Sequence, residues 1–131
     1  MVYWIFVVLL TFFVQCMLAP IVRYLLNAKG SVKIALGPRD NQPDMPVLGG
    51  RFDRALRNFM EALPIFLTLA LLAEQKGVAG GITELGSAIF AIARIVYVPA
   101  YVSGIPGLRS VVWMVGSAGL IAMVVGIWPH I

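Results

Sequence analysis

Charged residues are scarce in this sequence. Only 12% of its 131 residues are charged, 60% are hydrophobic, and the mean hydropathy is +0.92. Soluble domains carry about a quarter charged residues and less than half apolar ones, so this composition excludes an ordinary soluble domain. A membrane-spanning helix needs about 20 apolar residues, which leaves room for three or four such helices and no soluble domain. We therefore expect one all-α membrane domain over residues 1–131.

Cysteine and histidine each occur once, which limits the chemistry available. A single cysteine, Cys16, excludes an internal disulfide, and we interpret it as a small buried apolar residue. His130 lies next to the end of the sequence and is interpreted as a solvated interface residue. No grouping of His, Cys and carboxylates has metal-ligand spacing, so we predict no metal site. The basic residues form no exposed patch in polar surroundings, so no nucleic-acid partner is expected.

Long hydrophobic segments account for most of the sequence. They predict four spans, over about residues 2–26, 51–75, 84–102 and 108–128. No basic residue precedes the first segment, and it is too long for a secretory signal, so we interpret it as a retained span. The polar residues 27–50 are rich in glycine and proline and predict a long loop. The expected fold is a four-helix transmembrane bundle.

Basic residues are concentrated around the first loop. Seven of the ten lie there or at its flanks: Arg23, Lys29, Lys33, Arg39, Arg51, Arg54 and Arg57. The positive-inside rule therefore predicts cytoplasmic first and third loops and two non-cytoplasmic termini. Trp4 and Trp128 would then be interfacial anchors on the outer side. The compact loops favour a bacterial inner membrane.

Polar residues nevertheless recur inside two of the predicted spans. Arg54, Asn58 and Glu61 are spaced by four and three residues, which places them on one helix face. The next span carries a second stripe of the same kind, formed by Arg94, Tyr97 and Tyr101. Two such stripes on neighbouring helices predict one shared intramembrane site.

Depth in the membrane suggests a partner for one of these charges. At 1.5 Å per residue, Glu61 and Arg94 each lie roughly 15 Å from the cytoplasmic surface, so we expect them to form an ion pair. A lone charge at the bilayer centre costs about 3 kcal/mol on insertion scales, and pairing would offset this cost. Such a pair could serve only to hold the helices together, and this structural alternative stays open.

The full set of cations favours a ligand. Four arginines outnumber the two nearby acids, Asp53 and Glu61; they are Arg54, Arg57, Arg94 and Arg109. Guanidinium groups bind carboxylates through two parallel hydrogen bonds, so the excess predicts an anionic ligand that enters from the cytoplasm. Apolar walls around such a pocket would suit a hydrophobic second substrate.

Three segments carry longer motifs: residues 54–66 (RALRNFMEALPIF), residues 93–101 (ARIVYVPAY) and residues 108–110 (LRS). The first two are similar to the second-helix and third-helix signatures of the MAPEG family, the membrane-associated proteins in eicosanoid and glutathione metabolism, and the third to the segment that follows them. The length, the four spans and the long first loop agree as well, so the resemblance covers essentially the whole chain.

The resemblance implies a homotrimer with glutathione bound between neighbouring subunits. It implies these glutathione-binding residues: Arg54, Asn58, Glu61, Arg94, Tyr97 and Tyr101. Arg109 matches the arginine that stabilises the glutathione thiolate in several members, and is the expected catalytic residue. The implied function is a glutathione-dependent transferase or peroxidase that acts on a lipophilic small molecule or lipid.

Two other functions remain open from the sequence. The chain could be a non-catalytic accessory subunit or lipid-binding protein that keeps the fold and its polar cluster. It could also be a small anion or metabolite transporter, although transporters usually show internal repeats with broken helices at matching positions. No repeat is visible here, and the breaks near the middle of spans are Pro64 and Pro99.

Overall fold

The computed structural model describes residues 1–26, 32–38 and 44–131, and these residues contain only helices and their connections. The elements, in chain order, are α1 (Val2–Pro20), the π-helix η1 (Ile21–Leu26), α2 (Val32–Leu36), α3 (Val47–Gln75), α4 (Gly81–Val102), α5 (Leu108–Ile127) and the 3₁₀-helix η2 (Trp128–His130). Four helices are long and apolar enough to cross a membrane, which confirms the predicted all-α membrane architecture.

The predicted first loop is partly helical. It contains the short helix α2, and α3 begins at Val47, before the glycine pair whose composition indicates a turn. Gly49 is helical and allows close packing: a Cβ there would overlap the Met45 side chain and lie 3.2 Å from Val22. The loop cations Lys29 and Arg39 lie outside the described residues.

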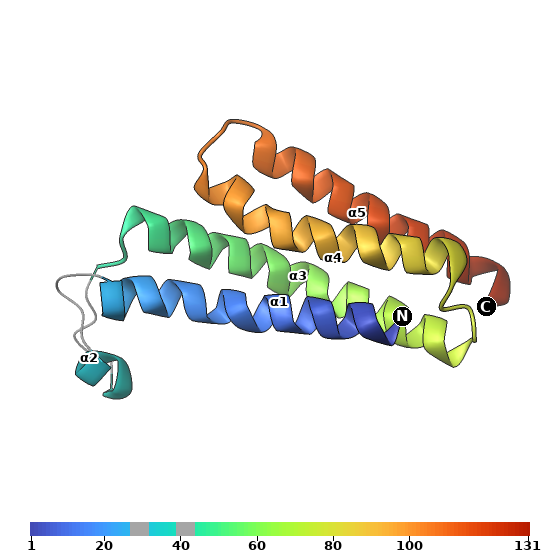
Figure 1. Cartoon of the computed structure of the whole chain (residues 1–131), viewed down its shortest axis with the longest axis horizontal. Helices are drawn as coiled ribbons and strands as arrows, with labels where there is room; N and C mark the ends of the chain where they lie inside the picture. The colour runs from blue at the N-terminus through green and yellow to red at the C-terminus, as the bar shows by residue number, and fades with distance from the viewer. Residues whose placement is uncertain (27–31, 39–43) are drawn as a thin grey trace.

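The helices pack as two pairs, α1 with α3 and α4 with α5 (Figure 1). Glycines allow the second pair to approach closely. A Cβ on Gly86 would overlap the backbone oxygen of Gly119, and a Cβ on Gly119 would lie 2.6 Å from that of Gly86. Small residues are the usual means of close helix packing in a bilayer, where no hydrophobic force drives helices together. We call this contact the glycine seam.

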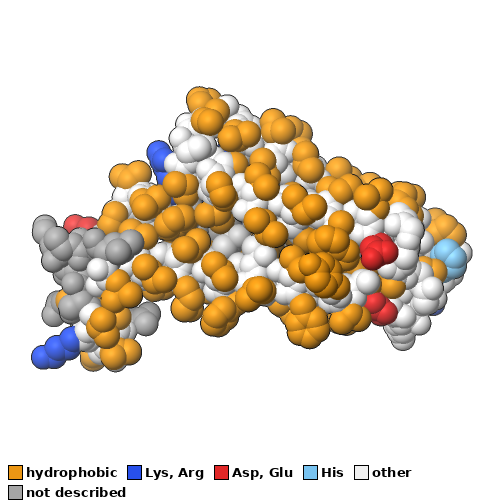
Figure 2. All heavy atoms as spheres, viewed as in Figure 1, with side chains coloured by type: hydrophobic (Ala, Val, Ile, Leu, Met, Phe, Trp, Pro, Cys, Tyr) orange, Lys and Arg blue, Asp and Glu red, His pale blue; other side chains and the backbone are white. Residues whose placement is uncertain are grey.

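Aromatic rings fill the space between the two pairs. Phe66 of α3 stacks on Phe90 of α4 with ring centroids 4.8 Å apart, and Phe59 lies 6.4 Å from the same ring. Val8 and Met123 complete the buried cluster from α1 and α5. The outward faces also carry many hydrophobic side chains, as Figure 2 shows for one face. Such a surface suits contact with lipid.

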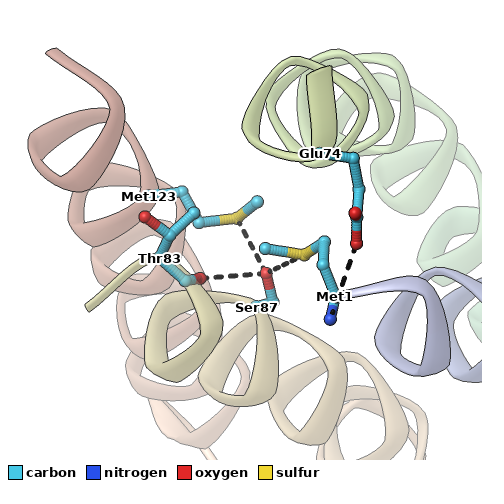
Figure 3. Close-up of polar contacts among 5 residues, drawn as sticks. All are labelled: Met1, Glu74, Thr83, Ser87 and Met123. Carbon is cyan, nitrogen blue, oxygen red and sulfur yellow. Dashed lines mark hydrogen bonds and ion pairs between the residues drawn. The ribbon is translucent and has the colours of Figure 1, made fainter. Parts of the chain in front are cut away.

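A polar cluster joins the helices at the end that carries Met1 and Ile131 (Figure 3). The buried Ser87 hydroxyl donates to the Thr83 carbonyl at 3.0 Å and lies 2.9 Å from the Met1 sulfur and 3.5 Å from the Met123 sulfur. The Met1 amino group lies 3.8 Å from a Glu74 carboxylate oxygen. These contacts fix one end of the bundle. We call the opposite end, which carries residues 103–107 between α4 and α5, the turn end.

Candidate functional site

The two predicted polar stripes face each other across α3 and α4. Arg94 is 3% exposed, and its Nη1 donates a hydrogen bond to the Asn58 side-chain oxygen at 2.9 Å. Its guanidinium carbon lies 4.5 Å from the Phe59 ring centroid and 4.4 Å from that of Tyr97. Cation–π contacts of this kind are strongest where water is excluded. Arg94 is therefore held in place inside the protomer by two aromatic rings and one amide.

The predicted Glu61–Arg94 ion pair is wrong. Among the described residues no salt bridge joins them, and Glu61 is exposed on α3. The reason is helical geometry: Glu61 follows Phe59 by two residues, about 200° around the helix, so it faces away from the buried Phe59 side. Asn58 is nearer to that side, and it becomes the partner of Arg94.

Arg94 consequently keeps unused hydrogen-bonding capacity. Its Nε and Nη2 are buried and have no hydrogen-bond partner. In the described part of the chain the two salt bridges are those of Met1 with Glu74 and of Arg57 with Asp53, so no carboxylate compensates the Arg94 charge. Buried charges without partners are costly, and inside membranes they usually mark functional sites.

A second group of cations gathers around Tyr101 at the turn end. Arg54 Nε donates to the Tyr101 hydroxyl at 2.8 Å, and the Arg109 guanidinium carbon lies 5.3 Å from the centroid of the Tyr101 ring. Beside them lies a hollow of about 260 Å³ that we call the cationic hollow; its lining includes Arg51, Tyr101, Arg109 and Ser110. None of its lining residues is acidic.

Local structure adds to the positive potential of the cationic hollow. Arg51 Nη1 donates to the Val102 carbonyl at 2.7 Å, which satisfies one of the orphan acceptors at the end of α4. Gly107 adopts φ +81° at the N-cap of α5 and offers no side-chain cap. Because α5 begins at Leu108, Arg109 and Ser110 lie in its first turn. The free N–H groups and the helix dipole there favour the binding of an anion.

Two tyrosines connect the buried and the outer cations. The rings of Tyr97 and Tyr101 meet edge to face with centroids 5.9 Å apart. Tyr97 contacts Arg94, while Tyr101 contacts both Arg54 and Arg109. The predicted site residues other than Glu61 thus form one continuous group of contacts, and Glu61 is exposed at the surface of the protomer.

Two residues of this region were missed from the sequence. Arg51 was interpreted only as a loop cation, because nothing in the spacing indicates that it reaches the end of α4. Gln15 is 4% exposed, and its Nε2 donates to the Arg94 backbone carbonyl at 3.2 Å. A signal for Gln15 was present: it is the one amide side chain in the predicted first span. Polar residues inside spans are rare and usually functional.

A comparison with protein-family models decides the family. The model of the MAPEG family matches residues 1–128, nearly the whole chain. The chain belongs to the MAPEG family. No curated protein and no solved structure matches it significantly. MAPEG membership and the four apolar helices together identify an integral membrane protein of a family associated with glutathione and eicosanoid metabolism, which also includes non-catalytic members.

Proposed function

We propose that this MAPEG protein binds glutathione at the turn end and transfers it to a lipophilic electrophile, or uses it to reduce a lipid peroxide. The observation that carries the proposal is the convergence of Arg54 and Arg109 on Tyr101, beside a hollow lined by cations and by no carboxylate. Family membership supports glutathione as the anion.

The charges of the site complement those of glutathione. Glutathione carries two carboxylates and one ammonium group. Arg51 lines the cationic hollow, and Arg54 is hydrogen-bonded to Tyr101 of its lining. Guanidinium is the best match to a carboxylate because it can donate two parallel hydrogen bonds. Glu61 is the exposed acid on the same stripe of α3 and is the proposed partner of the ammonium group. Asn58, Arg94 and Tyr97 complete the proposed site deeper inside the protomer.

Arg109 is the proposed catalytic residue. A free thiol has a pKa near 8.5, and a neighbouring cation lowers it towards neutrality. A guanidinium group is a fixed cation, so Arg109 would stabilise the thiolate by its charge and accept no proton; the thiol proton passes to water. In transfer, the sulfur forms a bond to an electrophilic carbon, and the bond from that carbon to its leaving group breaks with its electron pair on the leaving group, which takes a proton from water. In peroxide reduction, the sulfur forms a bond to one peroxide oxygen, the O–O bond breaks to release an alcohol, and a second glutathione converts the resulting sulfenic acid into a disulfide and water. Catalysis would come from positioning and from charge stabilisation.

The assembly and the membrane orientation belong to the same proposal. Glu61 is an exposed carboxylate within a membrane-spanning helix, and a second subunit would shield it from lipid. We propose a homotrimer of single-domain subunits over residues 1–131, with the glutathione site completed at the subunit boundary. The proposed location is a bacterial inner membrane, with the turn end in the cytoplasm and both termini on the other side.

Glutathione titration with thiolate detection tests the proposal. Purified protein is titrated while absorbance in the thiolate band is followed, for the wild type and for Arg109→Ala. We expect saturable binding for both proteins and a thiolate signal for the wild type only. Binding without any thiolate signal in the wild type would remove the proposed chemistry and leave a binding protein. The absence of binding at millimolar glutathione would favour the alternative, a non-catalytic accessory or lipid-binding subunit.

A further inference from the structure

Hydrogen bonds between the two helix pairs determine how the walls of the cationic hollow lie relative to one another. At the turn end, Arg51 of α3 donates to the Val102 carbonyl of α4. Arg54, on the next turn of α3, donates to the Tyr101 hydroxyl. These two guanidinium groups are also the proposed partners of the glutathione carboxylates. A bound carboxylate would compete for them, so both hydrogen bonds weaken when the site is occupied.

A hydrogen bond from α1 to α4 lies away from the cationic hollow. Gln15 of α1 is 4% exposed, and its Nε2 donates to the Arg94 backbone carbonyl at 3.2 Å. Gln15 lines an apolar groove between α1 and α4 and does not line the cationic hollow. A ligand in the hollow therefore leaves this hydrogen bond intact, and the two pairs stay joined through it.

The carbonyl that Gln15 binds lies next to the part of α4 that Pro99 weakens. Proline has no backbone N–H, so the carbonyl four residues before Pro99 loses its helical donor, and the proline ring crowds that carbonyl. Helices bend most readily at such a point. Pro99 lines the same groove as Gln15, so the weakened turn faces α1. Tyr101 follows this turn, and its position depends on how the turn is held.

We infer that Gln15 is a positioning residue of the proposed glutathione site. Its hydrogen bond holds the weakened turn of α4 against α1 and thereby fixes Tyr101 relative to α3. The glycine seam holds α5 against α4, so the same bond places Arg109. The chemical consequence rests on the proposed function: Gln15 sets how closely Arg109 approaches the glutathione sulfur.

Gln15→Met tests this inference with glutathione bound, because methionine has a similar length and no donor. Thiolate absorbance is followed as a function of pH. We expect its midpoint to rise by about 0.5–1 pH unit, because a cation displaced from about 4 Å to about 6 Å stabilises the thiolate less by about one pKa unit. Glutathione affinity should change less than about threefold, because Arg51 and Arg54 lie on α3.

Thr11→Val is the matched control. Thr11 lies one turn before Gln15 and lines the same groove, but its hydroxyl donates within α1, to the Val7 carbonyl at 2.7 Å. Its substitution removes a polar group from the groove and no bond between helices, so the thiolate midpoint should stay at the wild-type value.

Pro99→Ala tests whether Gln15 acts through the weakened turn. Alanine returns the missing backbone donor to α4. Gln15→Met should therefore raise the thiolate midpoint less in the Pro99→Ala background than in the wild type, which a double-mutant cycle measures. An equal rise in both backgrounds would mean that Gln15 acts independently of this turn and would overturn the inference.

A second measurement needs no glutathione. Nitroxide labels are attached through Val47→Cys, at the start of α3, and Ile105→Cys, in the turn after α4, in a Cys16→Ala background; Val47 and Ile105 are both exposed. Pulsed electron spin resonance then gives the distribution of distances between the two pairs. We expect a broader distribution for Gln15→Met and an unchanged one for Thr11→Val.

The outcomes separate this inference from the proposed function. If the wild type binds no glutathione, the proposed function fails, and the label distances alone decide whether Gln15 positions the turn end. An unchanged midpoint and unchanged distances in Gln15→Met would overturn the inference while the proposed function stands. If Gln15→Met does not fold, a folded Pro99→Ala/Gln15→Met protein would support the inference, and a double variant that also fails to fold would overturn it.

Discussion

Arg94 combines burial, positive charge and a neutral hydrogen-bond partner. Its guanidinium lies between the Phe59 and Tyr97 rings, it donates to Asn58, and two of its nitrogens have no partner. A residue kept only for the fold would be expected to bring a carboxylate with it, because the desolvation of an uncompensated charge is unfavourable. The arrangement therefore points to an anion that comes from outside the protomer.

Arg94→Met separates the structural role of this residue from its ligand role. Methionine has a similar length and no charge, so we expect thermal stability in detergent to stay within about 1 kcal/mol of the wild type or to rise. Glutathione affinity should fall at least about tenfold, because a charge-assisted hydrogen bond contributes about 1.5–3 kcal/mol.

Arg57→Met is the control for that experiment. Arg57 is paired with Asp53 at 3.2 Å, and its side chain is 75% exposed. Surface pairs of this kind contribute little to stability, so both stability and affinity should change by less than about 1 kcal/mol. If Arg94→Met unfolds the protein while Arg57→Met does not, Arg94 is a structural lock and its proposed part in binding fails.

Among single residues, the sequence predicted the polar stripes on α3 and α4 better than it predicted the contacts between them. The spacing of Arg54, Asn58 and Glu61 correctly placed them on one stripe, because helical periodicity is a local property. The partner of Arg94 was wrong, because residues at equal depth can still face different directions. The hydrogen bond from Arg51 to the Val102 carbonyl depends on the packing of α3 against α4, which no local sequence pattern encodes.

At the scale of the elements, the glycine seam determines how α4 and α5 pack. Gly119→Leu would force a side chain towards the Gly86 carbonyl and the Phe90 amide nitrogen, which lie 2.6 Å and 2.9 Å from the position that a Cβ would occupy. We expect a destabilisation of about 1–3 kcal/mol or more, measured as loss of the folded species on heating in detergent. Ala118→Leu is the control: Ala118 is exposed next to the seam, so its substitution should have little effect.

The spans and most of their ends were predictable, but the start of α3 was not. Long apolar runs fix the existence of the four helices, because only helices satisfy their backbone polar groups internally in lipid. The start of α3 was placed too late, because Gly49 and Gly50 are locally typical of a turn. Gly49 instead accommodates Val22, a contact between distant parts of the chain. Helix α2 interrupts a segment whose composition indicated only loop.

For the whole molecule, the exposed Glu61 carboxylate is the main argument for assembly. A carboxylate facing lipid within a span is costly, by about 3 kcal/mol on insertion scales. We therefore expect chemical crosslinking in mild detergent to give dimer and trimer bands and nothing larger. Glu61→Gln should keep the trimer and weaken glutathione binding, because the amide no longer pairs with the ammonium group. A chain that crosslinks only as a monomer would contradict the proposed subunit boundary.

The cationic hollow takes its side chains from both helix pairs: Arg51 lies on α3, while Tyr101 and Arg109 lie on α4 and α5. The glycine seam holds the second pair together as one unit, so the relative tilt of the two pairs sets the separation of these cations. Helix tilt responds to hydrocarbon thickness. We therefore expect the glutathione affinity of the unchanged protein to differ between nanodiscs of shorter-chain and longer-chain lipids. Bilayer thickness would then be an effector of the protein. Equal affinities across chain lengths would contradict this.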